Sequence, residues 1–92
     1  MTVKVRFFAR FRELLGTDIS VEPENGTTLT DLVRGIAKKN REGCDAIFDP
    51  EGNFHKFVIL MRNGKRVELR DAGSTVVSEG DEIAVFPPVA GG

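Results

Sequence analysis

The sequence predicts an α+β domain in which one main amphipathic helix covers one face of a four- or five-stranded mixed sheet. Short apolar runs that alternate with polar residues stand at both ends of the chain, and such runs are typical of half-buried strands. Between them, the apolar residues at 29, 32, 33, 36 and 37 share one helical face. Because one helical stripe covers one face of a sheet, the opposite face is left to solvent or to a binding partner.

The composition indicates one small globular domain and excludes several kinds of site. The 92 residues carry 13 basic and 14 acidic side chains, a net charge of −1 that provides no global attraction to nucleic acid or to an acidic membrane. We find neither an apolar run long enough to span a bilayer nor a signal peptide, and we expect a cytoplasmic protein. The sequence has one cysteine, Cys44, and one histidine, His55. An internal disulfide and a multi-thiolate metal site are therefore excluded, and we expect no bound cofactor.

The first part of the chain predicts a strand, a short helix and a second strand. Residues 2–8 alternate as a strand, although Phe8 places a large apolar ring on the polar side. Residues 9–15 form a short helix that Gly16 closes as its C-cap. The alternation in residues 18–22 predicts the second strand.

The long helix is bounded by capping and charge signals. Thr28 is suited to the N-cap, and Asp31 places negative charge in the first turn, where the helix dipole favours it. Lys38, Lys39 and Arg41 follow its last apolar residue. We interpret these three cations as a solvated helix end rather than as a nucleic-acid site.

The second part of the chain predicts a loop and three more strands. Residues 40–56 are interpreted as a loop with one helical turn near 45–48. Residues 57–61 are apolar on both faces, which predicts a central strand covered on both sides. The remaining elements are an Asn63-Gly64 hairpin turn, a return strand over 65–69 and a final strand over 82–86.

Two phenylalanines stand at the ends of the predicted first and last strands, on the face that the helix does not cover. If these strands are neighbours, Phe8 and Phe86 form one exposed apolar patch, a feature that marks binding sites on small proteins. In the alternative interpretation, Phe8 packs under the first helix and Phe86 folds against the prolines.

The last residues predict an extended flexible tail, 87–92, on a domain of residues 1–86. Two prolines stiffen the segment, and the side chains then become smaller toward the end, through Pro87, Pro88, Val89, Ala90, Gly91 and Gly92. Such a tail can thread a narrow channel.

A carboxylate at Gly92 can attack a nucleotide α-phosphate to give an acyl-adenylate, which sulfur or an amine can then capture. The chain has no phosphate loop, metal cluster or triad, so we expect a substrate and carrier rather than an enzyme. By composition alone, a disordered terminus remains the alternative.

Two blocks, KVRFFARFRELLGTD and EGDEIAVFPPVAGG, resemble the small subunit of molybdopterin synthase, within the ubiquitin-like family of sulfur carriers and archaeal small modifiers. The resemblance implies a β-grasp fold with parallel, adjacent first and last strands. It also implies that an E1-like enzyme adenylates the terminal glycine with ATP. The resulting thiocarboxylate donates sulfur, and archaeal members are also joined to lysines through isopeptide bonds.

Carried onto this chain, the resemblance makes Gly92 the activated residue, Gly91 its spacer, and Phe8 and Phe86 the docking aromatics. The implied partners are the E1-like enzyme and the large subunit of molybdopterin synthase or target lysines, and the free chain is expected to be a monomer. Arg66 stands where the family's docking face often has an aliphatic residue, and residues 41–56 depart from the shorter family pattern. A β-grasp binding module with an incidental Gly-Gly end remains the alternative, whereas a β-grasp ferredoxin is excluded by the single cysteine.

Overall fold

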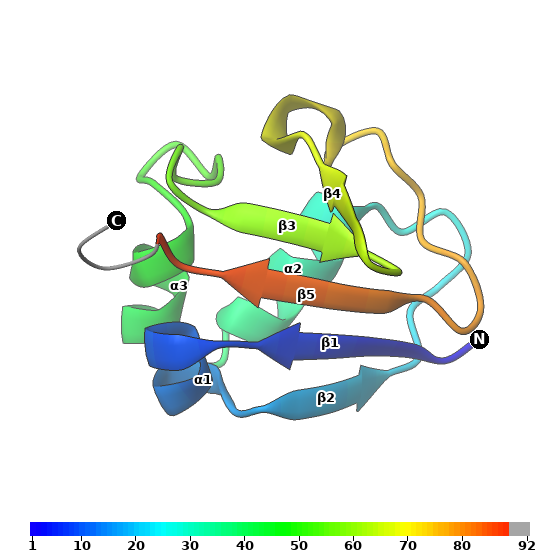
Figure 1. The fold of residues 1–92 in the computed structure, drawn as a ribbon, viewed down its shortest axis with the longest axis horizontal. Helices are drawn as coiled ribbons and strands as arrows, with labels where there is room; N and C mark the ends of the chain where they lie inside the picture. The colour runs from blue at the N-terminus through cyan, green and yellow to red at the C-terminus, as the bar shows by residue number, and fades with distance from the viewer. Residues whose placement is uncertain (89–92) are drawn as a thin grey trace.

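A computed structural model describes residues 1–88 and shows a five-stranded mixed sheet with its helices on one side (Figure 1). The strands are β1 (Val3–Phe7), β2 (Asp18–Val21), β3 (Ile59–Arg62), β4 (Lys65–Val67) and β5 (Glu82–Phe86). The helices are α1 (Ala9–Leu15), α2 (Leu29–Ala37), α3 (Arg41–Ile47) and the short 3-10 helix η1 (Leu69–Asp71).

The sheet has the order β2-β1-β5-β3-β4, so the last strand in the sequence lies at its centre. β1 and β5 are parallel neighbours, with Val5 opposite Ile83, and the other pairs are antiparallel. The prediction that the first and last strands lie side by side is therefore confirmed. Because both run in the same direction, their carboxyl ends lie at the same edge of the sheet (Figure 1).

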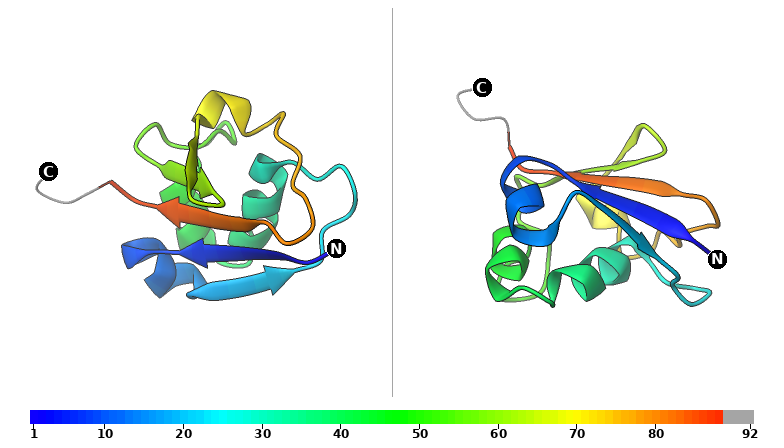
Figure 2. Two further views of the ribbon diagram at one scale, coloured as in Figure 1. Left: turned by 45° about the vertical axis from the view of Figure 1, so that its right-hand side comes forward. Right: turned by 90° about the horizontal axis from the view of Figure 1, so that it is seen from below.

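The core fills the space between one face of the sheet and a layer of three helices, α1, α2 and α3 (Figure 2). The expected stripe of α2 supplies one wall of this core, and Thr28 caps the helix by accepting a hydrogen bond from the Asp31 N–H at 3.2 Å. β1 and β5 supply the other wall through buried alternate residues such as Val5 and Val85. The prediction of one main helix on one face of the sheet is confirmed, and α1 and α3 pack beside it on the same face.

The segment predicted as a loop over 40–56 contains a two-turn helix, α3, which is a correction to the sequence-based prediction. Asn40 organises its start. Its Oδ1 accepts a hydrogen bond from the Gly43 N–H at 3.0 Å, and its Nδ2 donates to the Leu14 carbonyl at 2.8 Å. This cap stabilises the first turn and ties α3 to α1, while Ile47 enters the core. Arg41, interpreted as part of the end of α2, instead begins α3.

The loop that follows α3 is anchored to α2 by one arginine. The Arg34 guanidinium donates a hydrogen bond to the Gly52 carbonyl and lies 5.3 Å from the centre of the Phe48 ring. At the same turn, Asp49 Oδ1 accepts hydrogen bonds from the N–H groups of Glu51 and Asn53. These contacts order a segment whose glycine and proline residues had indicated irregular structure.

Two strand predictions need correction at their ends. The strand predicted over 57–61 begins at Ile59, is internal rather than central, and is not covered on both faces. Phe57 lies in the turn before it and is 46% exposed. The return strand predicted over 65–69 ends at Val67, since Leu69 turns into η1 and packs against the core. The Asn63-Gly64 turn is confirmed, with φ values of 51° and 83° that suit a tight hairpin.

Two helical glycines give a matched test of this packing. A Cβ at Gly35 in α2 meets no atom within 4 Å, whereas a Cβ at Gly43 in α3 lies 2.7 Å from Leu15 Cδ2 and 2.9 Å from Leu15 Cγ. We expect Gly35→Ala to raise the free energy of unfolding by roughly 0.5–1 kcal/mol through helix propensity. We expect Gly43→Ala to lower it by about 1 kcal/mol, because overpacking against α1 exceeds the same gain. Urea denaturation measures both, and stabilisation by Gly43→Ala would contradict the close contact between α1 and α3.

Candidate functional site

The face of the sheet opposite the helices carries a shallow cavity of about 280 Å³. Its centre is apolar, because Ala84 of β5 and Met61 of β3 are directly opposite each other in the register. The residues that line the cavity are Lys4, Arg6, Phe8, Met61, Asn63, Gly64, Glu82, Ile83, Ala84 and Phe86. We call this surface the open face.

Phe8 and Phe86 meet at the end of the open face where β1 and β5 finish. Their rings are stacked, with centroids 4.2 Å apart and an angle of 10° between the planes. Phe8 is the N-cap of α1, and its N–H donates to the Val85 carbonyl at 3.2 Å, so the backbone contact between β1 and β5 continues one residue past the end of β1. The two rings therefore meet in one apolar patch, as predicted, but both are half-buried rather than exposed. Phe8 stacks on Phe86 and lines the open face with it, and does not lie under the first helix.

Charged side chains surround the apolar centre of the open face. Arg6 Nε donates to Asp18 Oδ1 at 2.7 Å, and this hydrogen bond, together with the charge of Asp18, raises the pKa of the Arg6 guanidinium. Arg66 of β4 lies opposite Met61, and directly opposed residues of antiparallel strands share a face. The chain therefore carries a cation opposite Met61, where the family resemblance implied an aliphatic residue.

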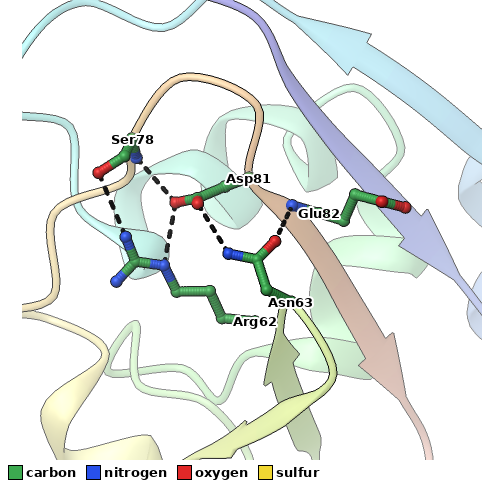
Figure 3. A network of polar contacts seen from close by, with 5 residues as sticks. All are labelled: Arg62, Asn63, Ser78, Asp81 and Glu82. Carbon is green, nitrogen blue, oxygen red and sulfur yellow. Dashed lines mark hydrogen bonds and ion pairs between the residues drawn. The ribbon is translucent and has the colours of Figure 1, made fainter.

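The start of β5 is held in place by a polar network centred on Asp81, which is only 5% exposed (Figure 3). Asp81 Oδ2 accepts hydrogen bonds from Arg62 Nε at 2.9 Å and from the Ser78 N–H at 2.7 Å. Asp81 Oδ1 accepts one from Asn63 Nδ2 at 2.9 Å, and Asn63 Oδ1 in turn accepts from the Glu82 N–H at 2.9 Å. The network joins the hairpin turn between β3 and β4 to β5, the strand that ends in Phe86.

The pKa of Asp81 reflects a balance between burial and these contacts. Burial alone disfavours the ionised form and raises the pKa, but the hydrogen bonds from Asn63 and Ser78 and the positive charge of Arg62 outweigh it. The net result is a pKa below the ordinary value of 3.8. Asp81 is therefore an ionised, fully paired carboxylate that supports the sheet. The sequence analysis did not predict this structural role, because it interpreted Gly80-Asp81-Glu82 only as the approach to the last strand and as part of the block that carries the family resemblance.

His55 and Cys44, the single histidine and the single cysteine, both contact other parts of the fold. The His55 ring stacks on Phe57 with centroids 4.9 Å apart, and its Nε2 contacts the Asp45 carbonyl at 2.9 Å. Cys44 is half-buried against the core. Among residues 1–88, no group of three or more His, Cys, Asp and Glu side chains is arranged to hold a metal ion. Within the same residues, no helix has the length and apolar character that crossing a membrane requires.

The predicted tail is only partly described. Pro87 is half-buried and Pro88 is exposed directly after β5. The remaining tail residues predicted to thread into a partner, Val89, Ala90 and Gly91, and the predicted reactive residue Gly92, lie outside the described residues. The structure therefore shows where the tail leaves the sheet, beside the Phe8–Phe86 stack.

The parallel β1–β5 pair at the centre of a mixed sheet, with a helical layer on one face, defines a ubiquitin-like β-grasp domain, as the sequence resemblance implied. The crystal structure of SAMP1 from Haloferax volcanii shares this fold, with a TM-score of 0.86, 25% identity and complete coverage of both chains. The chain belongs to the ThiS family, whose model matches residues 5–92.

Two curated relatives are similar over nearly their whole length. Small archaeal modifier protein 3 of Haloferax volcanii is 33% identical over 93 residues, covering 100% of each chain. The molybdopterin synthase sulfur carrier subunit of Escherichia coli is 31% identical over 96 residues, covering 98% of this chain and 99% of the relative. A solved protein–protein complex of subunits 1 and 2 of the molybdopterin-converting factor from Helicobacter pylori also matches, with a TM-score of 0.60, 27% identity and complete coverage of both chains. The predicted family is confirmed by these similarities.

Proposed function

We propose that this chain is a ubiquitin-like sulfur carrier and protein modifier that is activated at Gly92. The observation that carries the proposal is the ThiS family match, which extends through residue 92 and includes relatives named as sulfur carrier and as modifier. In the proposed activation, an oxygen of the Gly92 carboxylate attacks the α-phosphorus of ATP on an E1-like enzyme, and pyrophosphate leaves. A nucleophile at the oxidation level of sulfide then displaces AMP to give a thiocarboxylate, or a lysine amine displaces AMP to give an isopeptide bond.

In this proposal the chain supplies the carboxylate and the docking surface, and the activating enzyme supplies ATP and the catalytic groups. The open face is suited to docking because the stacked Phe8–Phe86 pair is adjacent to the point where the tail leaves β5. Aromatic anchors at the centre of a patch contribute much of the binding energy of protein interfaces. Docking at this face therefore brings the tail to the enzyme's reaction centre in one orientation.

The partners downstream of activation follow from the relatives. The Helicobacter pylori complex supports a large subunit of molybdopterin synthase as the acceptor of sulfur. The modifier relative of Haloferax volcanii supports target lysines as acceptors of an isopeptide bond. We place both reactions in the cytoplasm, where ATP is available, and propose a monomer as the free form.

Mass spectrometry of the intact protein, taken from its own cells, tests this function. We expect a fraction of the chain to carry the mass increase of one oxygen exchanged for sulfur at Gly92. Peptide mapping after tryptic cleavage should show residues 71–92, the segment that follows Arg70, joined through Gly92 to lysines of other proteins if the chain is also a modifier. If neither product forms across growth conditions that require molybdenum cofactor or impose stress, the chain is a non-covalent binding module and the proposal fails.

Replacing Phe86 tests the docking face separately. We expect Phe86→Ala to weaken binding of the E1-like enzyme by roughly 30-fold, the effect of losing an interface anchor worth about 2 kcal/mol. The loss of stability should be smaller, about 1 kcal/mol, because the ring is half-buried and loses only its stack on Phe8. Calorimetric titration and urea denaturation measure the two effects.

Phe57→Ala is the matched control, since this ring is 46% exposed and does not line the open-face cavity. Binding by this variant should equal that of the unchanged chain. Equal losses of affinity in both variants, or unfolding by Phe86→Ala, would show that Phe86 is not a docking residue.

A further inference from the structure

A second surface lies away from the open face, between the segment that leads into β3 and the segment that follows β4. Two cavities of about 340 Å³ and about 380 Å³ open here, and Lys56, Leu69 and Arg70 line both of them. We call this surface the basic cleft. It shares no lining residue with the open-face cavity, although Arg66 lines the cleft and lies opposite Met61 of the open face.

The basic cleft exists because the β3–β4 hairpin splits open. β4 pairs with β3 only from Leu60 to Arg62, and after Val67 the chain turns into η1. Ile59, the first residue of β3, therefore has a strand partner on the β5 side, Phe86, and none on the β4 side. Figure 1 shows β4 rising steeply away from β3 toward η1.

The charges on the basic cleft are predominantly positive. Lys56, Arg66 and Arg70 line it and are exposed, and none of the three makes an ion pair with another residue in the range 1–88. Glu68 is the one carboxylate among the lining residues. Since the whole chain has a net charge of −1, this concentration of cations is local. Such a surface attracts a short acidic partner without attracting polyanions to the protein as a whole.

Apolar side chains accompany these cations. Phe54 is buried and lines one cavity, Val67 lines the other, and Leu69 is half-buried and lines both. Successive side chains of an extended segment point in opposite directions. A segment in which acidic and apolar residues alternate can thus direct its carboxylates to the cations and its apolar side chains to Phe54, Val67 and Leu69.

We propose that the basic cleft binds an extended acidic segment of a partner protein, in which carboxylates alternate with apolar residues. Single-stranded nucleic acid fits less well, because it requires exposed aromatic rings for base stacking and Phe54 is buried. The proposal goes beyond activation at Gly92 and does not depend on it. It gives the chain a second contact surface besides the open face and the tail.

The test uses the ¹⁵N-labelled full chain and a synthetic peptide that alternates glutamate with valine. We expect amide shifts confined to residues 53–56 and 66–73. The double variant Lys56→Glu, Arg70→Glu should weaken the peptide at least about tenfold by reversing two attractive charges. Arg66 is left unchanged because it also borders the open face. The control is the double variant Lys38→Glu, Arg41→Glu, which makes the same change in net charge at exposed sites outside the cleft and should bind as the unchanged chain does.

Four results would overturn the proposal: no binding of the peptide, equal binding of a peptide with glutamine in place of glutamate, equal loss in both double variants, or shifts centred on Phe8 and Phe86. Tighter binding of an oligouridylate than of the peptide, lost in the Lys56→Glu, Arg70→Glu variant, would assign the cleft to nucleic acid instead. Activation of that variant by the E1-like enzyme should be unchanged, so failure of this proposal is distinguishable from failure of the carrier function.

Discussion

Deletion of Gly92 is expected to reduce adenylation of the chain by the E1-like enzyme to the background level. The shortened chain still ends in a glycine carboxylate, so the reactive group itself is retained. Its position changes, because one extended residue spans up to about 3.5 Å. A misplacement of about 1 Å can cost roughly 100-fold in rate, so a carboxylate that falls short by one residue does not reach the α-phosphorus of ATP. ATP–pyrophosphate exchange measures the adenylation.

Gly92→Ala separates the effect of the tail's length from the effect of side-chain size at its last residue. It keeps the length of the chain and adds one methyl group, so we expect a partial loss that is smaller than that of the deletion. Urea denaturation of both variants should match that of the unchanged chain, which would locate the defect in activation and not in folding. Unchanged pyrophosphate exchange after the deletion would contradict activation at Gly92.

Asp81→Asn is expected to lower the free energy of unfolding by about 2–4 kcal/mol, because it removes the charge of a buried carboxylate that accepts three hydrogen bonds. The asparagine lacks the negative charge that pairs with Arg62. In it an NH₂ group, which is a hydrogen-bond donor, replaces one carboxylate oxygen of Asp81, an acceptor, and this NH₂ group then faces N–H groups that are donors themselves. At least one of the donors from Arg62, Asn63 and Ser78 is then left without its partner. Because the same network joins the hairpin to β5, this change loosens the strand that carries Phe86.

The effect of Asp81→Asn should depend on pH in a defined direction. The folded state lowers the pKa of Asp81 below the ordinary value of 3.8, so the ionised form binds its proton less readily when folded. Its stabilisation is fully present above that ordinary value and is lost as the pH falls through the lower folded value. The stability difference between the two proteins is therefore large at neutral pH and narrows in strongly acidic solution.

Asp18→Asn is the matched control for Asp81→Asn, because Asp18 pairs with Arg6 at the exposed edge of the sheet. Exposed pairs contribute little, so its effect on urea denaturation at neutral pH should be much smaller. Equal effects of the two substitutions would contradict the role of the network. The role of the network would also be contradicted if the difference in free energy of unfolding between the unchanged chain and the Asp81→Asn variant increased as the pH is lowered.

The elements with a strong local signal were predicted well from the sequence. The stripe of α2, its Thr28 cap and the Asn63-Gly64 turn depend on contacts within a few residues, so the pattern alone determines them. α3 was predicted only as one turn near 45–48. Its cap, from the Gly43 N–H to Asn40 Oδ1, is local, but the contacts that hold the helix against α1 are distant: Asn40 donates to the Leu14 carbonyl, and Gly43 provides the space for Leu15. The sequence showed the asparagine and the glycine but not the helix against which they pack.

The candidate site divides in the same way. Alternation placed Phe8 and Phe86 on the face that the helix leaves open, and the closing Gly-Gly indicated a reactive tail. Whether the two rings meet depended on the parallel pairing of β1 with β5, strands separated by most of the chain, and only the fold brings them to 4.2 Å. The Asp81 network and the basic cleft are likewise products of tertiary structure, because each joins segments that the sequence leaves apart. The sequence by itself determined periodicity and the Thr28 cap, which are local, and it predicted the chemistry of the tail. The tertiary structure decided which surfaces those residues form, because side chains distant in sequence interact only after the sheet has aligned their strands.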